Sequence, residues 1–240
     1  MTVPICDVEV LLPVHNEGES IGQTVREIFA ELSREVRVSF IICEDGSTDN
    51  TKAVLRDLAQ SVPANLIMSD ERKGYSRAVK DGMAALRADY LLCLDSDGQC
   101  DPKDFWQFWR ERTNFDVLVG WRTDRADTWM RKNMSRLFYH VYQAIFRTPL
   151  HDPSCPFVLV PSRVLDRLLP ELGEMQQGFW WEFVARVFRR GYSMKELPVH
   201  HRLRLAGKTQ VYHLSKLPGI GYRHFIALFR IWSQTRPPVK

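Results

Sequence analysis

The sequence predicts a single α/β domain with a mostly parallel central sheet and helices on both of its faces. Short, continuous apolar runs alternate along the chain with segments whose apolar residues recur at helical spacing, and this alternation is typical of strand-helix-strand units. Continuous apolar runs indicate strands that are buried on both faces. A chain of 240 residues, of which 45% are hydrophobic, is also long enough to bury one large core.

The individual elements follow in chain order. Five apolar runs are predicted as strands, at residues 8–14, 38–44, 65–68, 90–95 and 116–121. Helical spacing predicts helices over residues 21–32 and 75–86, and the basic, aromatic segment 129–146 is a further helix candidate. We expect one domain over residues 1–214, followed by an amphipathic helix and tail over residues 215–240.

Composition narrows the classes of partner and the location. The net charge of +4 is too small an excess to indicate a nucleic-acid partner. Five cysteines without a CxxC spacing are typical of free thiols in a reducing compartment. The N-terminus lacks the pattern of a signal peptide, and no apolar run approaches the roughly 18 residues of a membrane span. We therefore expect a cytoplasmic protein that is soluble or peripheral.

Polar clusters follow three of the predicted strands. They are HNEGE at residues 15–19, EDGSTDN at residues 44–50 and DSDGQ at residues 95–99. In open parallel sheets, ligands bind beyond the carboxyl ends of the strands. We therefore expect these three acidic loops to meet at one edge of the sheet and to form the ligand site.

Asp95 and Asp97 are the leading candidates for metal ligands. The period of two in a strand aims both carboxylates the same way, and their mutual repulsion would raise both pKa values unless a cation lay between them. Mg²⁺ and Mn²⁺ prefer such hard oxygen ligands, and Gln99 could add a neutral oxygen. The alternative is a solvated turn, because Asp, Ser and Gly all favour turns.

Carboxylates in the two earlier loops are candidates for contacts with a nucleoside. Glu44 and Asp45 end the second strand, where they could accept hydrogen bonds from a base or a ribose. Glu17 is a second such acceptor, although it could equally be a favourable charge at a helix N-terminus. Gly74 and Gly82 lie on one helical face, which permits close approach to a ligand or simply close packing.

Cationic and aromatic residues mark the second half of the chain. The cationic candidates near the site are Arg122, Arg131, Lys132, Arg136, Arg202, Arg204 and Lys208. Arginine forks match phosphate oxygens, although each of these residues taken singly is more typical of an exposed surface charge. His200 and His201 lack a partner at metal-ligand spacing, which favours polar strand positions. Trp180 and Trp181 are predicted to be packing groups.

Taken in this order, the motifs resemble those of the family 2 inverting glycosyltransferases with the GT-A fold, most closely the dolichol-phosphate and polyprenyl-phosphate mannose synthases. The resemblance covers roughly residues 8–210 and implies a single GT-A-like, Rossmann-like domain. Its metal-binding DxDxQ motif falls on Asp95, Asp97 and Gln99. Its donor-nucleotide contacts, from the PxxNE loop, the base-binding aspartate and a GLGTAYxxGM-like segment, fall on Pro13, Val14, Glu17, Asp45, Gly74, Asp95 and Ser96.

The resemblance continues into the second half, with departures. It implies catalytic roles for Asp97, Arg122, Glu182 and Arg204, and acceptor or phosphate contacts for Arg122, Arg131, Ser135, Arg204 and Lys208. In the family's DxTSGFR motif, this chain has Pro156 in place of the glycine and Val158 in place of the arginine. Gln210 stands where the family's GxSK loop has its lysine, and Lys208 comes two residues early. The acceptor site is therefore expected to differ from the family pattern more than the donor site.

The implied reaction is transfer of a hexose, with mannose from GDP-mannose as the first choice, to dolichyl or polyprenyl phosphate. Mg²⁺ or Mn²⁺ and basic groups would neutralise the diphosphate leaving group while the acceptor attacks from the opposite face. A hydroxyl acceptor would need a general base, for which Glu182 and Asp152 are candidates, whereas a lipid phosphate is already anionic. The alternatives are a donor such as UDP-glucose, a soluble acceptor, a non-catalytic nucleotide-sugar binding module, or a phosphatase of the DxDG type.

The C-terminal segment suggests a route to a lipid substrate. Its apolar stripe consists of Phe225, Leu228, Phe229 and Trp232, and Arg223, Arg230 and Arg236 add positive charge. Such a helix can lie in the headgroup plane of a membrane. It can also be an ordinary terminal helix packed on the core, which the stripe alone favours. The first alternative would make the protein peripheral on the cytoplasmic face of a membrane.

Overall fold

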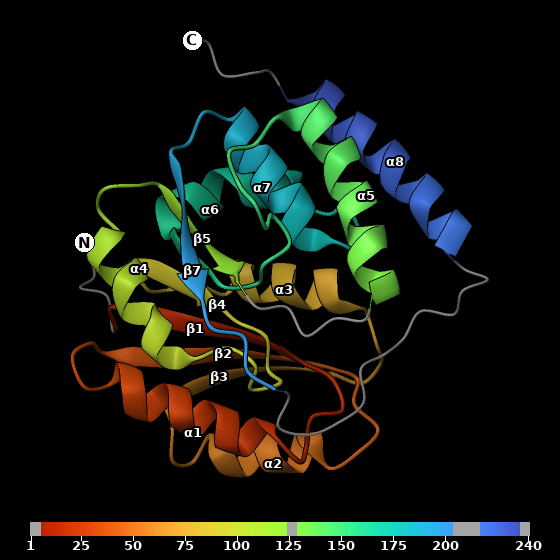
Figure 1. Cartoon of the computed structure of the whole chain (residues 1–240). Helices are drawn as coiled ribbons and strands as arrows, with labels where there is room; N and C mark the ends of the chain where they lie inside the picture. Colours follow the sequence, from red (N-terminus) through yellow and green to blue (C-terminus); the bar gives the residue numbers. More distant parts are fainter. Residues whose placement is uncertain (1–5, 124–128, 204–216, 236–240) are drawn as a thin grey trace.

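The computed structural model of the chain describes residues 6–123, 129–203 and 217–235 (Figure 1). Within these ranges, residues 129–135 and 217–220 are described by their backbone alone. The predicted single α/β architecture is confirmed, since one sheet runs through the described part of the chain and helices cover both of its faces.

The sheet has seven strands in the described residues. They are β1 (Val8–Val14), β2 (Val38–Asp45), β3 (Ala64–Ser69), β4 (Tyr90–Cys93), β5 (Val117–Arg122), β6 (Val158–Pro161) and β7 (Met194–Val199). Their order across the sheet is β3-β2-β1-β4-β6-β5-β7, and only β6 runs against its neighbours. All five strands expected from the apolar runs are present, with small shifts at their ends, whereas β6 and β7 are not among those five.

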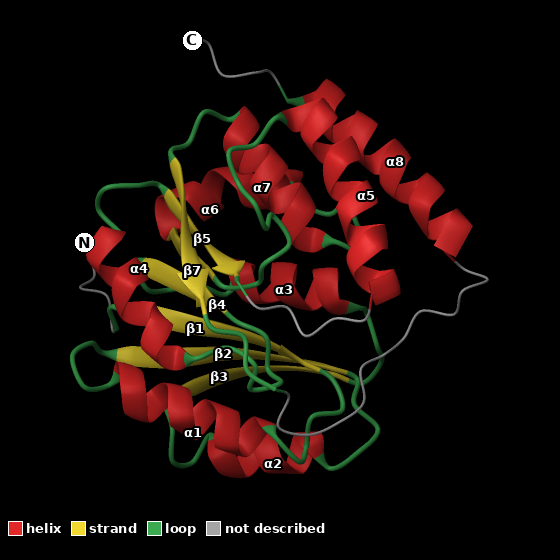
Figure 2. Ribbon diagram, viewed as in Figure 1, coloured by secondary structure: helices red, strands yellow, loops and turns green. Residues whose placement is uncertain are grey.

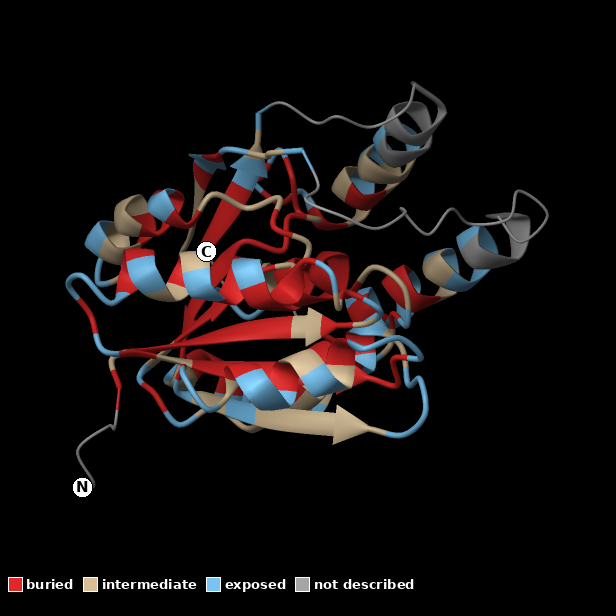
Figure 3. Ribbon diagram, turned by 90° about the horizontal axis from the view of Figure 1, so that it is seen from below, coloured by how far each residue is buried: buried red, intermediate tan, exposed pale blue. Residues whose placement is uncertain are grey.

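The helices form a layer on each face of the sheet. They are α1 (Ile21–Leu32), α2 (Thr51–Leu58), α3 (Tyr75–Ala84), α4 (Phe105–Glu111), α5 (Trp129–Phe146), α6 (Ser162–Leu168), α7 (Phe179–Arg189) and α8 (Leu217–Gln234), with short 3₁₀ turns at Pro102–Asp104 and Leu169–Glu171. Figure 2 shows α1, α2 and α4 on one face and α3 with α5 to α8 on the other. Figure 3 shows that the central strands are buried between the helices, whereas the edge strands β3 and β7 are largely only half-buried.

The main core lies along the central strands. Leu11, Ile41 and Leu92 are completely buried, as the continuous apolar runs predicted. Gly82 lets α3 approach this core closely, because a Cβ atom at that position would lie 2.2 Å from the Leu11 side chain and 2.7 Å from the Cys43 sulfur. Gly82 is therefore explained by packing, the second of the two possibilities left open by the sequence.

A second hydrophobic cluster joins α5, α7 and α8. Its buried members are Tyr142, Phe146, Met175, Trp181, Ala185, Ala227, Leu228 and Ile231. The expectation that the terminal helix packs on the rest of the chain is thus confirmed. The packed face differs from the expected stripe, however, because Leu228 is buried whereas Phe225, Phe229 and Trp232 are 56%, 59% and 44% exposed. No helix among the described residues is both long and apolar enough to cross a bilayer.

Candidate active site

The three acidic loops meet at one edge of the sheet, as predicted. Strands β2, β1 and β4 are neighbours and run parallel, so the loops that follow them leave the sheet side by side. Pro13 and Val14 end β1, where they pair with Cys43 and Glu44 of β2. The register therefore holds the predicted donor loop against the end of the next strand.

The loops after β1 and β2 are joined by hydrogen bonds. The Asn16 backbone N–H donates to Ser47 Oγ (2.9 Å), and the Thr48 N–H donates back to Asn16 Oδ1 (2.9 Å). Asn16 has a φ of 54°, a left-handed conformation that asparagine adopts more readily than most residues. The Glu17 N–H donates to Thr51 Oγ1 (3.0 Å). These bonds make the two loops one unit at the start of α1 and α2.

Glu17, Glu44 and Asp45, the three carboxylates predicted to contact a nucleoside, are all buried in this unit. Glu17 accepts a hydrogen bond from the Ser20 hydroxyl (2.9 Å). Asp45 accepts the backbone N–H groups of Lys73 (2.6 Å) and Gly74 (2.9 Å), one on each carboxylate oxygen. Asp45 thus fixes the segment before α3, and the φ of +95° at Gly74 is a conformation that favours glycine.

Asp95, Ser96 and Asp97 follow β4 at the same edge, with Ser96 buried and both aspartates half-buried. Asp95 accepts a hydrogen bond from the Tyr75 hydroxyl (3.0 Å), which itself accepts one from the Trp180 indole N–H (2.8 Å). Although 39% of Tyr75 is exposed, its hydroxyl lies between these two groups. Burial of the hydroxyl and the charge of Asp95 raise the pKa of Tyr75 well above 10.

Tyr75 and Trp180 have a role at this edge that was not predicted from the sequence. Tyr75 was predicted only as an apolar position of a helix, and Trp180 only as a packing group. One signal was available, because the GLGTAY motif of the resemblance has leucine where this chain has Tyr75. A phenol at the first residue of α3 can reach the carboxylates that follow β4, whereas leucine offers no hydrogen bond.

Asp97 and Gln99 turn the chain back across the edge. Asp97 Oδ1 accepts the Gln99 backbone N–H (3.1 Å). The Gln99 side-chain amide donates to the Arg202 carbonyl (3.1 Å), and the Arg202 N–H donates to the Gln99 carbonyl (2.8 Å). The DSDGQ loop is therefore tied to the segment that follows β7, which the sequence alone did not indicate.

The donor set at this edge fits a Mg²⁺ or Mn²⁺ ion. Asp95 and Asp97 bring two hard carboxylates into one turn, and their charges contribute, after burial, to raising the pKa of the nearby Cys100 thiol. Magnesium commonly binds through one or two carboxylates, with substrate phosphates and water completing its shell. Among the described residues, no group of three His, Cys, Asp or Glu side chains is arranged to hold a metal ion. Two carboxylates would leave the remaining coordination positions of such an ion to other ligands.

Arg122 brings positive charge to the same edge from the end of β5. Its guanidinium forms a two-pronged ion pair with Asp152 (2.7 and 3.0 Å) and donates to Ser154 Oγ (2.9 Å). Burial by itself would lower the pKa of Arg122, but the hydrogen bonds and charge of Asp152 outweigh it and raise this pKa, with a smaller contribution from Asp95. Arg122 is therefore a fixed cation close to the acidic loop.

Glu196 of β7 binds the backbone of the segment that carries Asp152, and this contact was not predicted. Its carboxylate accepts the backbone N–H groups of His151 (2.9 Å) and Asp152 (2.7 Å) and contacts the His151 ring (2.7 Å). This contact has no sequence signature, because 45 positions separate Glu196 from His151 and only the pairing of β5 with β7 brings them together.

Glu182 lies deeper than a proton-transfer role suggested. It is completely buried in α7, where it accepts the backbone N–H groups of Gly173, Glu174 and Met175 (2.8 to 3.2 Å). Arg186 donates to the same carboxylate (2.9 Å). Glu182 thus holds the 173–175 segment in place, and its catalytic role stays a prediction.

Four of the residues predicted to contact the acceptor or its phosphate have no described side chain. Arg131 and Ser135 lie in the first two turns of α5, where only the backbone is described, and Arg204 and Lys208 lie outside the described residues. The acceptor contacts assigned to these four residues therefore stay predictions.

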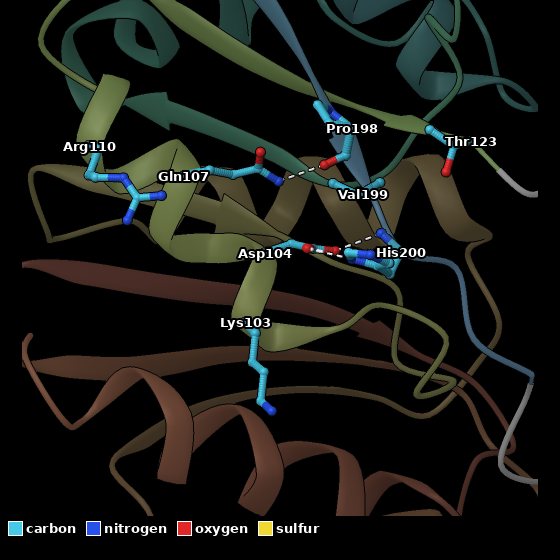
Figure 4. Close-up of a pocket in the computed structure, with 8 residues that line it drawn as sticks. All are labelled: Lys103, Asp104, Gln107, Arg110, Thr123, Pro198, Val199 and His200. Atoms are coloured by element: carbon cyan, nitrogen blue, oxygen red, sulfur yellow. Dashed lines mark hydrogen bonds and ion pairs between the residues drawn. The ribbon is translucent and has the colours of Figure 1, made fainter.

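A cavity of about 370 Å³ opens on the α4 side of the sheet (Figure 4). Its lining consists of Lys103, Asp104, Gln107, Arg110, Thr123, Pro198, Val199 and His200. Asp104 accepts the His200 N–H (2.6 Å) and pairs with the His200 ring (2.9 Å), and this pairing raises the pKa of His200 above 6.5. His200 is thus a polar residue directly after β7, and its carboxylate partner Asp104 ends the 3₁₀ turn that precedes α4.

The comparison that decides the family concerns the first two thirds of the chain. The sequence profile of "Glycosyl transferase family 2" matches residues 9–169, which include all three acidic loops and Arg122. The chain belongs to glycosyl transferase family 2. This family 2 glycosyltransferase is 26% identical over 221 residues to the undecaprenyl-phosphate 4-deoxy-4-formamido-L-arabinose transferase of Enterobacter sp. (strain 638). The match covers 90% of the chain and 65% of that relative, so the chain spans just under two thirds of the relative's length.

Solved structures show the same fold at lower identity. Mannosyl-3-phosphoglycerate synthase from Rubrobacter xylanophilus superposes with a TM-score of 0.71 at 15% identity, over 95% of this chain and 74% of that one. Glucosyl-3-phosphoglycerate synthase from Mycobacterium tuberculosis, in complex with Mg²⁺ and UDP, gives a TM-score of 0.72 at 15% identity, over 98% and 82% of the two chains. The same enzyme with Mn²⁺, UDP and phosphoglyceric acid gives 0.71 at 16% identity, over 95% and 79%. The predicted GT-A-like fold of this family 2 glycosyltransferase is thereby confirmed.

Proposed function

We propose that this protein is a metal-dependent, inverting glycosyltransferase that moves a hexose from a nucleotide sugar to a polyprenyl or dolichyl phosphate. One observation carries the proposal. Asp95 and Asp97 lie at the end of β4, next to the coupled loops that follow β1 and β2. That arrangement places two cation-binding carboxylates beside the proposed nucleoside contacts Glu17 and Asp45, as transfer from a nucleoside diphosphate sugar requires.

The side chains at this edge have different roles in the proposed reaction. Asp95 and Asp97 would hold a divalent cation, which supplies neutralisation of the charge that develops on the diphosphate. Tyr75 orients Asp95 through its hydroxyl, and Arg122 adds a fixed positive charge nearby. Gly74, Glu17 and Asp45 shape the nucleoside side of the site.

An anionic acceptor agrees with the contacts of the two candidate general bases. Asp152 is held by both prongs of Arg122, and Glu182 is buried under three backbone N–H groups and Arg186. An acceptor hydroxyl would need one of them as a base, whereas a phosphate that is already ionised attacks without one. The name of the Enterobacter relative, an undecaprenyl-phosphate transferase, supports the same class of acceptor.

The donor sugar is a narrower proposal. The resemblance to the mannose synthases makes GDP-mannose the first choice. UDP-glucose is the second choice, because solved structures of this fold contain UDP and, in one case, UDP-glucose. A soluble phosphorylated acceptor is the corresponding alternative to the lipid, since phosphoglyceric acid is bound in some of those structures.

A transfer assay tests the proposal as a whole. The full chain is incubated with Mn²⁺, a panel of nucleotide sugars, and either polyprenyl phosphate or 3-phosphoglycerate, and the products are identified by mass. We expect a hexosyl polyprenyl phosphate that does not form with the Asp97→Asn variant. A hexosylated phosphoglycerate in place of the lipid product would select the soluble acceptor, and inorganic phosphate release without transfer would overturn the proposal.

The proposed location is the cytoplasmic face of a membrane, to which the protein binds peripherally, with residues 1–214 as the catalytic domain and residues 215–240 as a membrane-associating helix and tail. The acceptor carries the argument, because a polyprenyl phosphate lies with its phosphate at the membrane surface.

A further inference from the structure

Helix α8 has a second face that no described part of the chain covers. Ala227, Leu228 and Ile231 are buried against α5 and α7. A separate set of large side chains points outward, and its exposed fractions are 69% for Tyr222, 56% for Phe225, 59% for Phe229 and 44% for Trp232. Their spacing of three or four residues puts these four on one side of the helix. We call this set the aromatic face of α8.

This face is unusual in both size and composition. Four of the eight large hydrophobic residues that are exposed among the described residues belong to it, whereas scattered single exposures are the norm for soluble proteins. Tyrosine and tryptophan, which combine an apolar ring with a polar group, occupy its two ends. Such residues concentrate where a membrane meets water.

The segment of sequence that contains the aromatic face carries basic but no acidic residues. Residues 197–240 contain eight arginines and lysines and no aspartate or glutamate, although the net charge of the whole protein is only +4. Helix α5, which packs beside α8, also contains no acidic residue. The sequence around α8 is therefore basic, and such a segment is complementary to an anionic surface.

Two of these cations lie next to the aromatic face. Arg223 and Arg230 are exposed and seven residues apart, so they share one flank of α8. Arg230 lies 3.5 Å from Glu174 but keeps 62% of its side chain exposed, and an exposed pair of this kind is weak. Both guanidinium groups can therefore reach phosphate groups outside the protein.

We infer that the aromatic face of α8 docks on an anionic lipid bilayer, with its rings at the level of the headgroups and with Arg223 and Arg230 on lipid phosphates. The inference specifies which face of the proposed membrane-associating helix meets the lipid, and it rests on the proposed function only for the identity of the membrane-bound acceptor. In Figure 1, α5 and α8 begin on the side to which β1, β2 and β3 point. The beginning of α8 and the carboxyl edge of the sheet therefore lie on the same side of the molecule.

Vesicle flotation of the full chain tests the inference. The vesicles contain phosphatidylcholine alone or with about 30% phosphatidylglycerol, at low salt, because anionic headgroups attract basic segments within a Debye length. We expect the full chain to bind to the anionic vesicles. The Phe225→Ser/Phe229→Ser variant should bind them about tenfold or more weakly, because it lacks two of the rings that would be buried in the lipid. The rings are more than half exposed, so the thermal unfolding temperature should stay near that of the wild type.

A charge-matched pair of variants separates a specific surface from net charge. Arg223→Glu/Arg230→Glu and Arg56→Glu/Arg167→Glu change the total charge equally, but Arg56 and Arg167 are exposed on α2 and α6. Only the first pair should lose flotation. Equal loss in both pairs would overturn the inference, as would unchanged flotation of the serine variant.

Two further measurements examine direct contact with lipid and self-association of the protein. Brominated phospholipid should quench tryptophan emission in the wild type and less so in Trp232→Phe, which reports contact of this ring with the bilayer. Sedimentation of the serine variant examines self-association, because a dimer that the substitutions dissociate without affecting flotation would assign the face to a second copy and overturn the inference. The Asp97→Asn variant should still float, so failure of transfer and failure of docking are read separately.

Discussion

The edge formed by the loops after β1, β2 and β4 differs from the α5, α7 and α8 side in what holds it together. At the edge, polar side chains bind backbone groups of other loops, as Asp45 does with Lys73 and Gly74. On the helical side, apolar packing of residues such as Tyr142, Trp181 and Leu228 supplies the cohesion. Polar networks of the first kind leave motifs in a sequence, because each bond needs one residue type at one position, whereas apolar packing accepts many substitutions.

The largest effect is expected at the edge itself. Asp97→Asn should lower transfer by about 100-fold or more, because it removes a charged ligand from the proposed cation while leaving the core untouched. Product formation with Mn²⁺ measures the effect, and urea unfolding should show unchanged stability. Asp57→Asn, at an exposed position of α2, is the matched control. Near-normal transfer by Asp97→Asn would show that this edge of the sheet is not the catalytic site.

The buried carboxylate of the helical side gives the next effect, and it concerns stability. Glu182→Ala should lower the free energy of unfolding by about 3 to 5 kcal/mol, because Arg186 and three backbone N–H groups would lose their acceptor inside the protein. Denaturant unfolding measures this loss, and Glu182→Gln, which keeps an acceptor oxygen, should lose less. A variant as stable as the wild type but inactive would instead assign Glu182 to the chemistry.

Tyr75 links the two regions and should have a smaller effect. Tyr75→Phe removes the hydroxyl that joins Trp180 to Asp95. A neutral hydrogen bond contributes about 1 kcal/mol, so we expect Mn²⁺ binding in the presence of a nucleoside diphosphate to weaken by about threefold to tenfold. Calorimetric titration measures the affinity. An unchanged affinity would show that Asp95 needs no support from α3.

The smallest effect concerns His200 and depends on pH. Because Asp104 raises the pKa of His200 above 6.5 in the folded protein, the pair stabilises the fold fully below pH 6.5, and this contribution disappears as the pH rises through the folded value. The unfolding temperature of His200→Asn should therefore fall below that of the wild type in mildly acidic buffer and approach it in alkaline buffer. A difference that grew with pH would reverse the assigned sign.

The sequence predicted the parallel half of the fold more completely than the rest. Strands such as Val38–Asp45 are long and continuously apolar, whereas β6 has four residues between Pro156 and Ser162 and runs antiparallel, so neither length nor period marked it. In the site, the positions of Asp45, Asp95 and Asp97 at strand ends followed from the pattern. The partners of Glu182 and Glu196 did not, because backbone N–H groups brought near by tertiary folding carry no sequence signature.

The packing of the terminal helix α8 is a second feature that the sequence alone could not predict. Apolar residues recur on two sides of α8, and the sequence alone could not say which side packs. The expected stripe mixed Leu228, which is buried, with Phe229, which is exposed. Only the positions of α5 and α7 decide between the two faces.

Binding of Mn²⁺ is the decisive measurement, because we propose that Asp95 and Asp97 hold a cation only together with a diphosphate. Titration of Mn²⁺ into the full chain, followed by electron paramagnetic resonance with and without GDP or UDP, measures this dependence. We expect one Mn²⁺ ion to bind tightly in the presence of nucleotide and much more weakly in its absence. The nucleotide-dependent binding should be lost in Asp97→Asn. Binding of Mn²⁺ that is indifferent to nucleotide, or that survives in Asp97→Asn, would contradict this proposal.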